Sequence, residues 1–135
     1  MNGLLDTSMV VRYLTGDPPE LADRAAQVID AVDRLGVTGV VLAETAYVLT
    51  SVYGVPRAVV VDHLIAFVQK KNIATVGLDK GAVLQALLLC RPSGRVSFAD
   101  AMVWAAAQSS GVGVVYTLDE RFPADGLELR TGPQS

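Results

Sequence analysis

Short apolar runs rich in β-branched residues alternate along this chain with longer segments in which apolar residues recur at helical spacing. The runs predict strands at 4–6, 37–43, 73–78 and 112–119, with an edge strand at 127–130. The intervening segments predict helices at 8–14, 18–35, 44–54, 56–71, 79–90 and 96–111. Because strands that alternate with helices favour a mostly parallel central sheet covered by helices on both faces, the expected fold class is a three-layer α/β/α domain.

Capping signals set several of the expected helix ends. Asp17 before Pro18, followed by Glu20, is typical of an N-cap with a capping box, and Gly36 is the expected end of that helix. The length of 135 residues is that of one domain, so we expect a single domain over residues 1–135, with the last five residues as a loose tail.

The composition indicates where in the cell the protein is expected and which partners it is not expected to have. A formal net charge of −3 argues against a basic protein that coats nucleic acid. A single cysteine, Cys90, cannot form an internal disulfide, and the start of the chain has no basic segment typical of a secretory signal. No apolar run reaches the roughly 18–20 residues that a membrane span needs. We therefore expect a cytoplasmic protein without a membrane partner.

Four acidic residues occupy positions where ligands bind in parallel α/β proteins. Asp6, Glu44 and Asp119 stand at or just past the predicted carboxyl ends of strands, and Asp100 lies in the first turn of the most apolar helix. Since ligands bind beyond the carboxyl ends of such strands, we expect the four to gather at one edge of the same sheet. Taken singly, each also fits an ordinary role as a cap or a turn residue, and the stretch from Ser97 to Asp100 fits a loose capping box at the start of the most apolar helix.

The neighbours of these acids favour a metal ion. Glu44 and Asp100 have apolar residues one helical turn away, and an ionised carboxylate in apolar surroundings is costly unless it is paired or bound to metal. Two like charges about 4 Å apart repel by roughly 4 kcal/mol at an effective dielectric constant near 20. A divalent cation would hold such a group together.

Oxygen ligands determine which cation is expected. The acids have the hydroxyls of Thr7, Ser8 and Thr117 nearby in sequence, while the only histidine, His63, lies on a different helix. Hard oxygen ligands suit Mg²⁺ or Mn²⁺, whereas zinc prefers His or Cys. Carboxylate sites of this kind act on phosphate esters by activating a bound water molecule, which predicts hydrolysis.

The net charge of the protein is compatible with binding of a polyanionic substrate. Without the four acids, ten acidic residues face eleven basic ones. Arg91, Arg95 and Arg121 lie in predicted loops close in sequence to the acids and are candidates for contacting phosphate, with a solvated surface position as the alternative.

Four stretches together resemble the PIN-domain ribonucleases, and most of all the VapC toxins of bacterial VapBC toxin–antitoxin pairs. They are "LLDTSMVVRYLTGD", "LAETAYVL", "SFADAMVWAAA" and "TLDERF", within residues 4–122. The resemblance implies a three-layer α/β/α fold and Mg²⁺- or Mn²⁺-dependent endonucleolytic cleavage of RNA. It also implies neutralisation by a cognate VapB-type antitoxin and homodimerisation.

The resemblance also implies roles for individual residues. Asp6, Asp100 and Asp119 match metal ligands, and Glu44 matches a ligand or an acid that positions water. Thr7 and Thr117 match supporting hydroxyl positions.

Two other functions remain open from the sequence. An α/β phosphotransfer domain is one, although a dehalogenase-type phosphatase needs an aspartate where Ser8 stands, and a receiver domain needs a second acid at the first strand. The other is a non-catalytic PIN-like scaffold that only binds a partner, which would bind no divalent metal.

Overall fold

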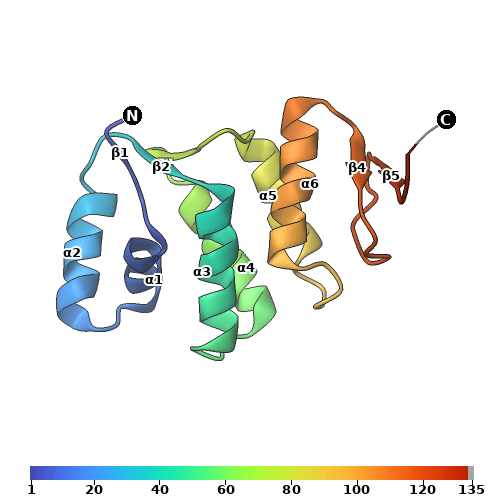
Figure 1. Cartoon of the computed structure of the whole chain (residues 1–135). Coiled ribbons are helices and arrows are strands. Elements are labelled where there is room, and N and C mark those ends of the chain that lie inside the picture. The colour runs from blue at the N-terminus through green and yellow to red at the C-terminus, as the bar shows by residue number, and fades with distance from the viewer. Residues whose placement is uncertain (134–135) are drawn as a thin grey trace.

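The computed structural model describes residues 1–133, whose helices and strands alternate as the sequence predicts (Figure 1). The helices are α1 (Thr7–Thr15), α2 (Pro19–Ile29), α3 (Gly39–Ser51), α4 (Arg57–Val68), α5 (Lys80–Leu89) and α6 (Phe98–Ser110). The strands are β1 (Gly3–Leu4), β2 (Leu35–Val37), β3 (Ile73–Thr75), β4 (Val114–Tyr116) and β5 (Glu128–Arg130).

All strand pairings are parallel, which confirms the expected α/β class. The order β1-β2-β3 forms one sheet, in which Leu35 pairs with Gly3 on one side and Ile73 on the other. The expectation that all strand ends share one edge is wrong, because β4 and β5 form a separate two-stranded sheet. Figure 1 shows β4 and β5 beyond α6, away from β1. The backbone of β4 pairs with β5 and not with the three-stranded sheet. Strand β1 is only two residues long.

The region between residues 29 and 43 also differs from the prediction. The helix predicted to reach residue 35 ends at Ile29. The strand predicted at 37–43 is wrong beyond Val37, because β2 covers Leu35–Val37 and α3 begins at Gly39. Thr38 is the reason, since its side chain accepts a hydrogen bond from the backbone N–H of Val41 at 3.2 Å and starts the helix. The apolar residues after Thr38 therefore belong to α3.

Gly36 lies inside β2 and does not end a helix. A Cβ atom at this position would lie 2.8 Å from Cδ2 of Leu4 and 2.8 Å from Cγ2 of Val76. The glycine therefore allows close packing beside this strand.

Of two predicted helix N-caps, one is wrong and the other is confirmed. The N-cap of α2 is Pro18 and not Asp17, whose carboxylate instead accepts a hydrogen bond from the hydroxyl of Tyr53 at 3.5 Å. The capping role of Ser97 at the start of α6 is confirmed, because its hydroxyl oxygen accepts a hydrogen bond from the backbone N–H of Asp100 at 3.0 Å.

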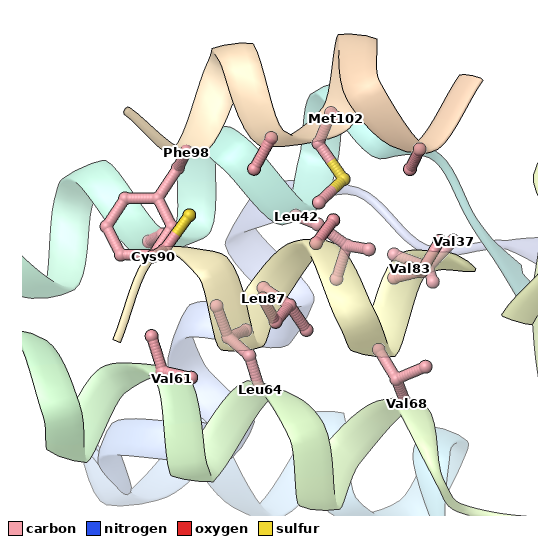
Figure 2. Packing of buried hydrophobic residues seen from close by; sticks show 14 of the residues in the cluster. Val37, Leu42, Val61, Leu64, Val68, Val83, Leu87, Cys90, Phe98 and Met102 are labelled. Atoms are coloured by element: carbon pink, nitrogen blue, oxygen red, sulfur yellow. The ribbon is translucent and has the colours of Figure 1, made fainter. Parts of the chain in front are cut away.

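Helices α3, α4, α5 and α6 enclose the main apolar core (Figure 2). Its side chains include Leu42 of α3, Leu64 of α4, Leu87 of α5 and Met102 of α6. The core packs helix against helix as well as helix against the three-stranded sheet, so it fixes α3 beside α6.

Trp104 lies in this core with 4% of its surface exposed. None of the helices in residues 1–133 combines the length and apolar character needed to cross a membrane. Of the predicted loose tail, residues 131–133 form neither helix nor strand, and residues 134–135 lie outside the described residues.

Candidate active site

Asp6 at the start of α1 and Glu44 in the middle of α3 line the same pocket and form the first acid pair. The buried residue Thr7 donates a hydrogen bond from its hydroxyl to Oε1 of Glu44, which joins residues 37 positions apart in sequence. Asp6 occupies the N-cap position of α1, but its carboxylate makes no capping hydrogen bond and accepts one from the hydroxyl of Ser8 at 3.1 Å. The Asp6 carboxylate is exposed and is not needed to start the helix.

A pocket of about 440 Å³ opens at this pair. Asp6, Thr7, Ser8 and Glu44 contribute to its lining together with Arg12. The pocket therefore combines carboxylate and hydroxyl oxygens with a guanidinium group.

Asp100 in the first turn of α6 and Asp119 in the loop after β4 form the second acid pair. Burial raises the pKa of the half-buried Asp100 carboxyl above its ordinary value, and a hydrogen bond to Asp119 and the charge of that residue raise it further. The pKa of Asp119 is lowered, first because the backbone N–H of Arg121 donates to its Oδ1 at 2.9 Å. Asp119 is therefore the stronger acid of the two, and Asp100 takes up a proton first as the pH falls.

Two nearby groups hold the Asp119 loop in shape. The hydroxyl oxygen of Thr117 accepts a hydrogen bond from the backbone N–H of Asp119 at 3.0 Å. The guanidinium Nε of Arg121 lies 3.6 Å from Oδ1 of the same aspartate. Thr117 thus orients the loop, and Arg121 supplies the one nearby positive charge recorded at this carboxylate among residues 1–133.

The four predicted acids thus lie as two pairs, and the structure does not bring them together as one cluster. Across residues 1–133 there is no group of three acidic, histidine or cysteine side chains close enough to hold a metal ion. The pairs are nevertheless carried by adjoining elements, since α1 packs on α3 and α3 packs on α6 (Figure 1). Their separation follows from the two sheets, because β1 leads to Asp6 and β4 leads to Asp119.

Glu44 also departs from the prediction in its position and surroundings. It lies within α3, past the first turn, and is exposed, as are Val40 and Tyr47 on the same helix. The premise that Glu44 faces apolar surroundings is wrong, because α3 turns its other side, with Leu42 and Ala46, into the core. For Asp100 the premise holds in part, since that residue is half-buried.

The three predicted arginines have different environments. Arg91 makes two hydrogen bonds to the carboxylate of Asp62 on α4, at 2.9 and 3.0 Å. Arg95 is exposed, and its backbone N–H donates to Ser93 at 3.2 Å. Arg121 is the one of the three that the structure brings next to a predicted acid.

The sequence interpretation missed Arg12 and Tyr53, which also line the pocket at Asp6. A signal for Arg12 was available, because it follows Ser8 by four residues on a helix and therefore shares its face. Tyr53 follows the end of α3 and has no comparable sequence signal.

The chemistry of the donors fits Mg²⁺ or Mn²⁺, because every candidate ligand is an oxygen atom. Asp100 and Asp119 are near enough that Asp119 helps to raise the pKa of Asp100, and two neighbouring carboxylates attract a cation.

Comparison with known proteins adds the family. The chain matches the family model of the PIN domain over residues 3–125, which is most of its length. No curated protein matches it, and no solved structure matches it. The chain belongs to the PIN-domain family.

Proposed function

We propose that the protein is a Mg²⁺- or Mn²⁺-dependent endoribonuclease and the VapC-type toxin of a type II toxin–antitoxin pair. PIN domains are generally nucleases, which is the basis of the proposal. The observation that carries it is the presence of two carboxylate pairs. Asp6 and Glu44 line one pocket, and Asp119 lies close enough to Asp100 to add to the effect of burial in raising the pKa of Asp100. The helices beside these pairs adjoin one another, since α1 packs on α3 and α3 packs on α6.

Asp6, Glu44, Asp100 and Asp119 would share one cation by drawing the two pairs together around it, because among residues 1–133 the acids lie apart as two pairs. When bound, such an ion lowers the pKa of a water molecule and stabilises the charge that develops on a phosphate during hydrolysis. The hydroxyl of Thr7 orients the Glu44 carboxylate by donating to it, and Thr117 orients the loop that carries Asp119. Of the three loop arginines, Arg91 is paired with Asp62 and Arg121 lies beside Asp119. Arg95 makes no ion pair among residues 1–133 and can contact RNA phosphates without breaking one.

The proposed partners are a cognate VapB-type antitoxin and a second copy of the chain, in the cytoplasm. An apolar groove of about 470 Å³ between the start of α3 and the face of α6 supports a protein partner. Val40 is 77% exposed at this groove, and Val103 is 48% exposed. Since the groove includes Ala99, next to Asp100, an antitoxin that fills it would lie close to the second acid pair.

Cleavage of RNA with controlled metal content tests the proposal. We expect purified protein to cut total RNA in Mg²⁺ or Mn²⁺, to lose this activity in EDTA, and to regain it when Mn²⁺ is added in excess of the chelator. Gel electrophoresis of the RNA fragments measures the result. Intact RNA at every metal concentration would favour the non-catalytic scaffold, and cleavage that persists in EDTA would contradict the metal-dependent mechanism.

A further inference from the structure

The pocket at Asp6 and Glu44 extends to two residues that the proposed metal site does not use. Arg12 of α1 and Tyr53, just past α3, line it together with the apolar side chains of Val48 and Val52. Arg12 also lines a neighbouring pocket of about 380 Å³, whose other residues include Arg24. Arg12 therefore stands between two open pockets, one of which contains the first acid pair.

The guanidinium of Arg12 is held in place but retains free donors. Its Nη1 atom donates to the backbone carbonyl of Asp17 and to the hydroxyl of Tyr53, each at 3.2 Å. No hydrogen bond from its Nε or Nη2 atoms and no salt bridge of Arg12 is found among residues 1–133. An arginine that is fixed through one nitrogen can present the remaining N–H groups to an anion without losing further conformational entropy.

Arg12 is placed to contact the phosphate of a nucleotide next to the one that lies at the acids. Ser8 and Arg12 are four residues apart on α1, which corresponds to about 6 Å along a helix axis. The backbone of Arg12 therefore lies one helical turn beyond Ser8, whose hydroxyl contacts Asp6, and the Arg12 guanidinium reaches the Tyr53 hydroxyl. Tyr53 is 36% exposed, and an exposed aromatic residue gives a nucleobase a surface on which to stack.

We propose that Arg12 and Tyr53 bind the nucleotide adjacent to the cleaved bond, with Arg12 on its phosphate and Tyr53 against its base. This inference rests on the proposed cleavage of RNA and extends it to the path of the strand. The RNA then runs from the acid pair along the exposed side of α1 toward the end of α3. Arg12 and Tyr53 are binding residues, and neither takes part in the chemistry at the phosphorus atom.

Binding of a fluorescein-labelled single-stranded RNA of mixed sequence, measured by anisotropy in EDTA over a range of salt concentrations, tests the role of Arg12. Each neutralised phosphate on a single strand contributes about −0.7 to the slope of log K against log salt concentration. We expect Arg12→Gln to make the slope less negative by about 0.7 and Arg12→Lys to preserve it. Arg34→Gln, at an exposed arginine directly before β2, is the matched control and should leave the slope unchanged.

Two variants of Tyr53 separate stacking from a structural role of its hydroxyl. We expect Tyr53→Phe to bind the RNA as the native protein does and Tyr53→Ala to bind about tenfold more weakly, because only the alanine removes the ring. Equal weakening in both would contradict stacking and assign the effect to the hydroxyl bond with Arg12. Thermal unfolding of each variant reports whether it folds. If Arg12→Gln does not fold, the inference is judged on the salt slope of Arg12→Lys and on the affinities of Tyr53→Phe and Tyr53→Ala.

Cleavage of total RNA by the native protein is measured in parallel. If the native protein cuts RNA but Arg12→Gln keeps the native salt slope, the inference about Arg12 is wrong and the nuclease proposal stands. If the native protein cuts no RNA under any metal condition, the proposed function fails and this inference fails with it.

Discussion

Asp100→Asn is expected to lower the rate of RNA cleavage by at least about 100-fold while the protein remains folded. Loss of groups that only orient metal ligands already costs about 10- to 100-fold, and Asp100 is proposed to contact the ion itself. The fold should survive because Ser97 caps α6 through the backbone N–H of residue 100, which the substitution retains. Removing the charge also relieves the repulsion that Asp119 exerts on the half-buried carboxylate.

Initial cleavage rates in Mn²⁺, with circular dichroism to verify the fold, measure this effect. Asp23→Asn is the matched control, because it makes the same chemical change at an exposed position on α2 and should cleave at the native rate. A folded Asp100→Asn variant that cuts RNA as fast as the native protein would remove Asp100 from the catalytic site.

Phe67→Ala is expected to lower the free energy of unfolding by about 3–5 kcal/mol, the range for truncating a buried phenylalanine. Phe67 is 2% exposed on α4, and its ring centroid lies 6.2 Å from that of Tyr13 on α1. The alanine would leave a cavity between α4 and its neighbours and remove this aromatic contact.

Equilibrium unfolding in urea measures the effect. Val59→Ala on the same helix is the control, since Val59 is 41% exposed and its truncation should cost less than about 1 kcal/mol. If the two variants were equally stable, α4 would not be packed as the structure has it.

The sequence predicted the helices well where a local signal and the final packing agree. Ser97 caps α6, and the apolar spacing of α4 places Val60, Leu64 and Phe67 in the core. The prediction failed around Thr38 because an apolar, β-branched run fits a buried strand and a buried helix equally well. The hydrogen bond from Val41 to Thr38 decided between them.

The sequence named the candidate acids, but it could not show which of them lie beside one another. The chemistry of Asp6, Glu44, Asp100 and Asp119 marks them in the sequence as candidates. Which acid lies beside which depends on contacts between distant segments, such as the bond from Thr7 to Glu44. The partition of the strands into two sheets is equally non-local, since it depends on the pairing of β4 with β5.

Titration of the protein with Mn²⁺ by calorimetry, in the native form and in the Asp6→Asn and Asp100→Asn variants, tests the central claim most directly. If the two acid pairs hold the cation together, either substitution should weaken the whole of the measured Mn²⁺ binding by about 10-fold or more. Independent pairs would give a different result, in which each variant loses one binding event and keeps another at native affinity. That outcome, or a native protein that binds no Mn²⁺, would contradict a shared metal site.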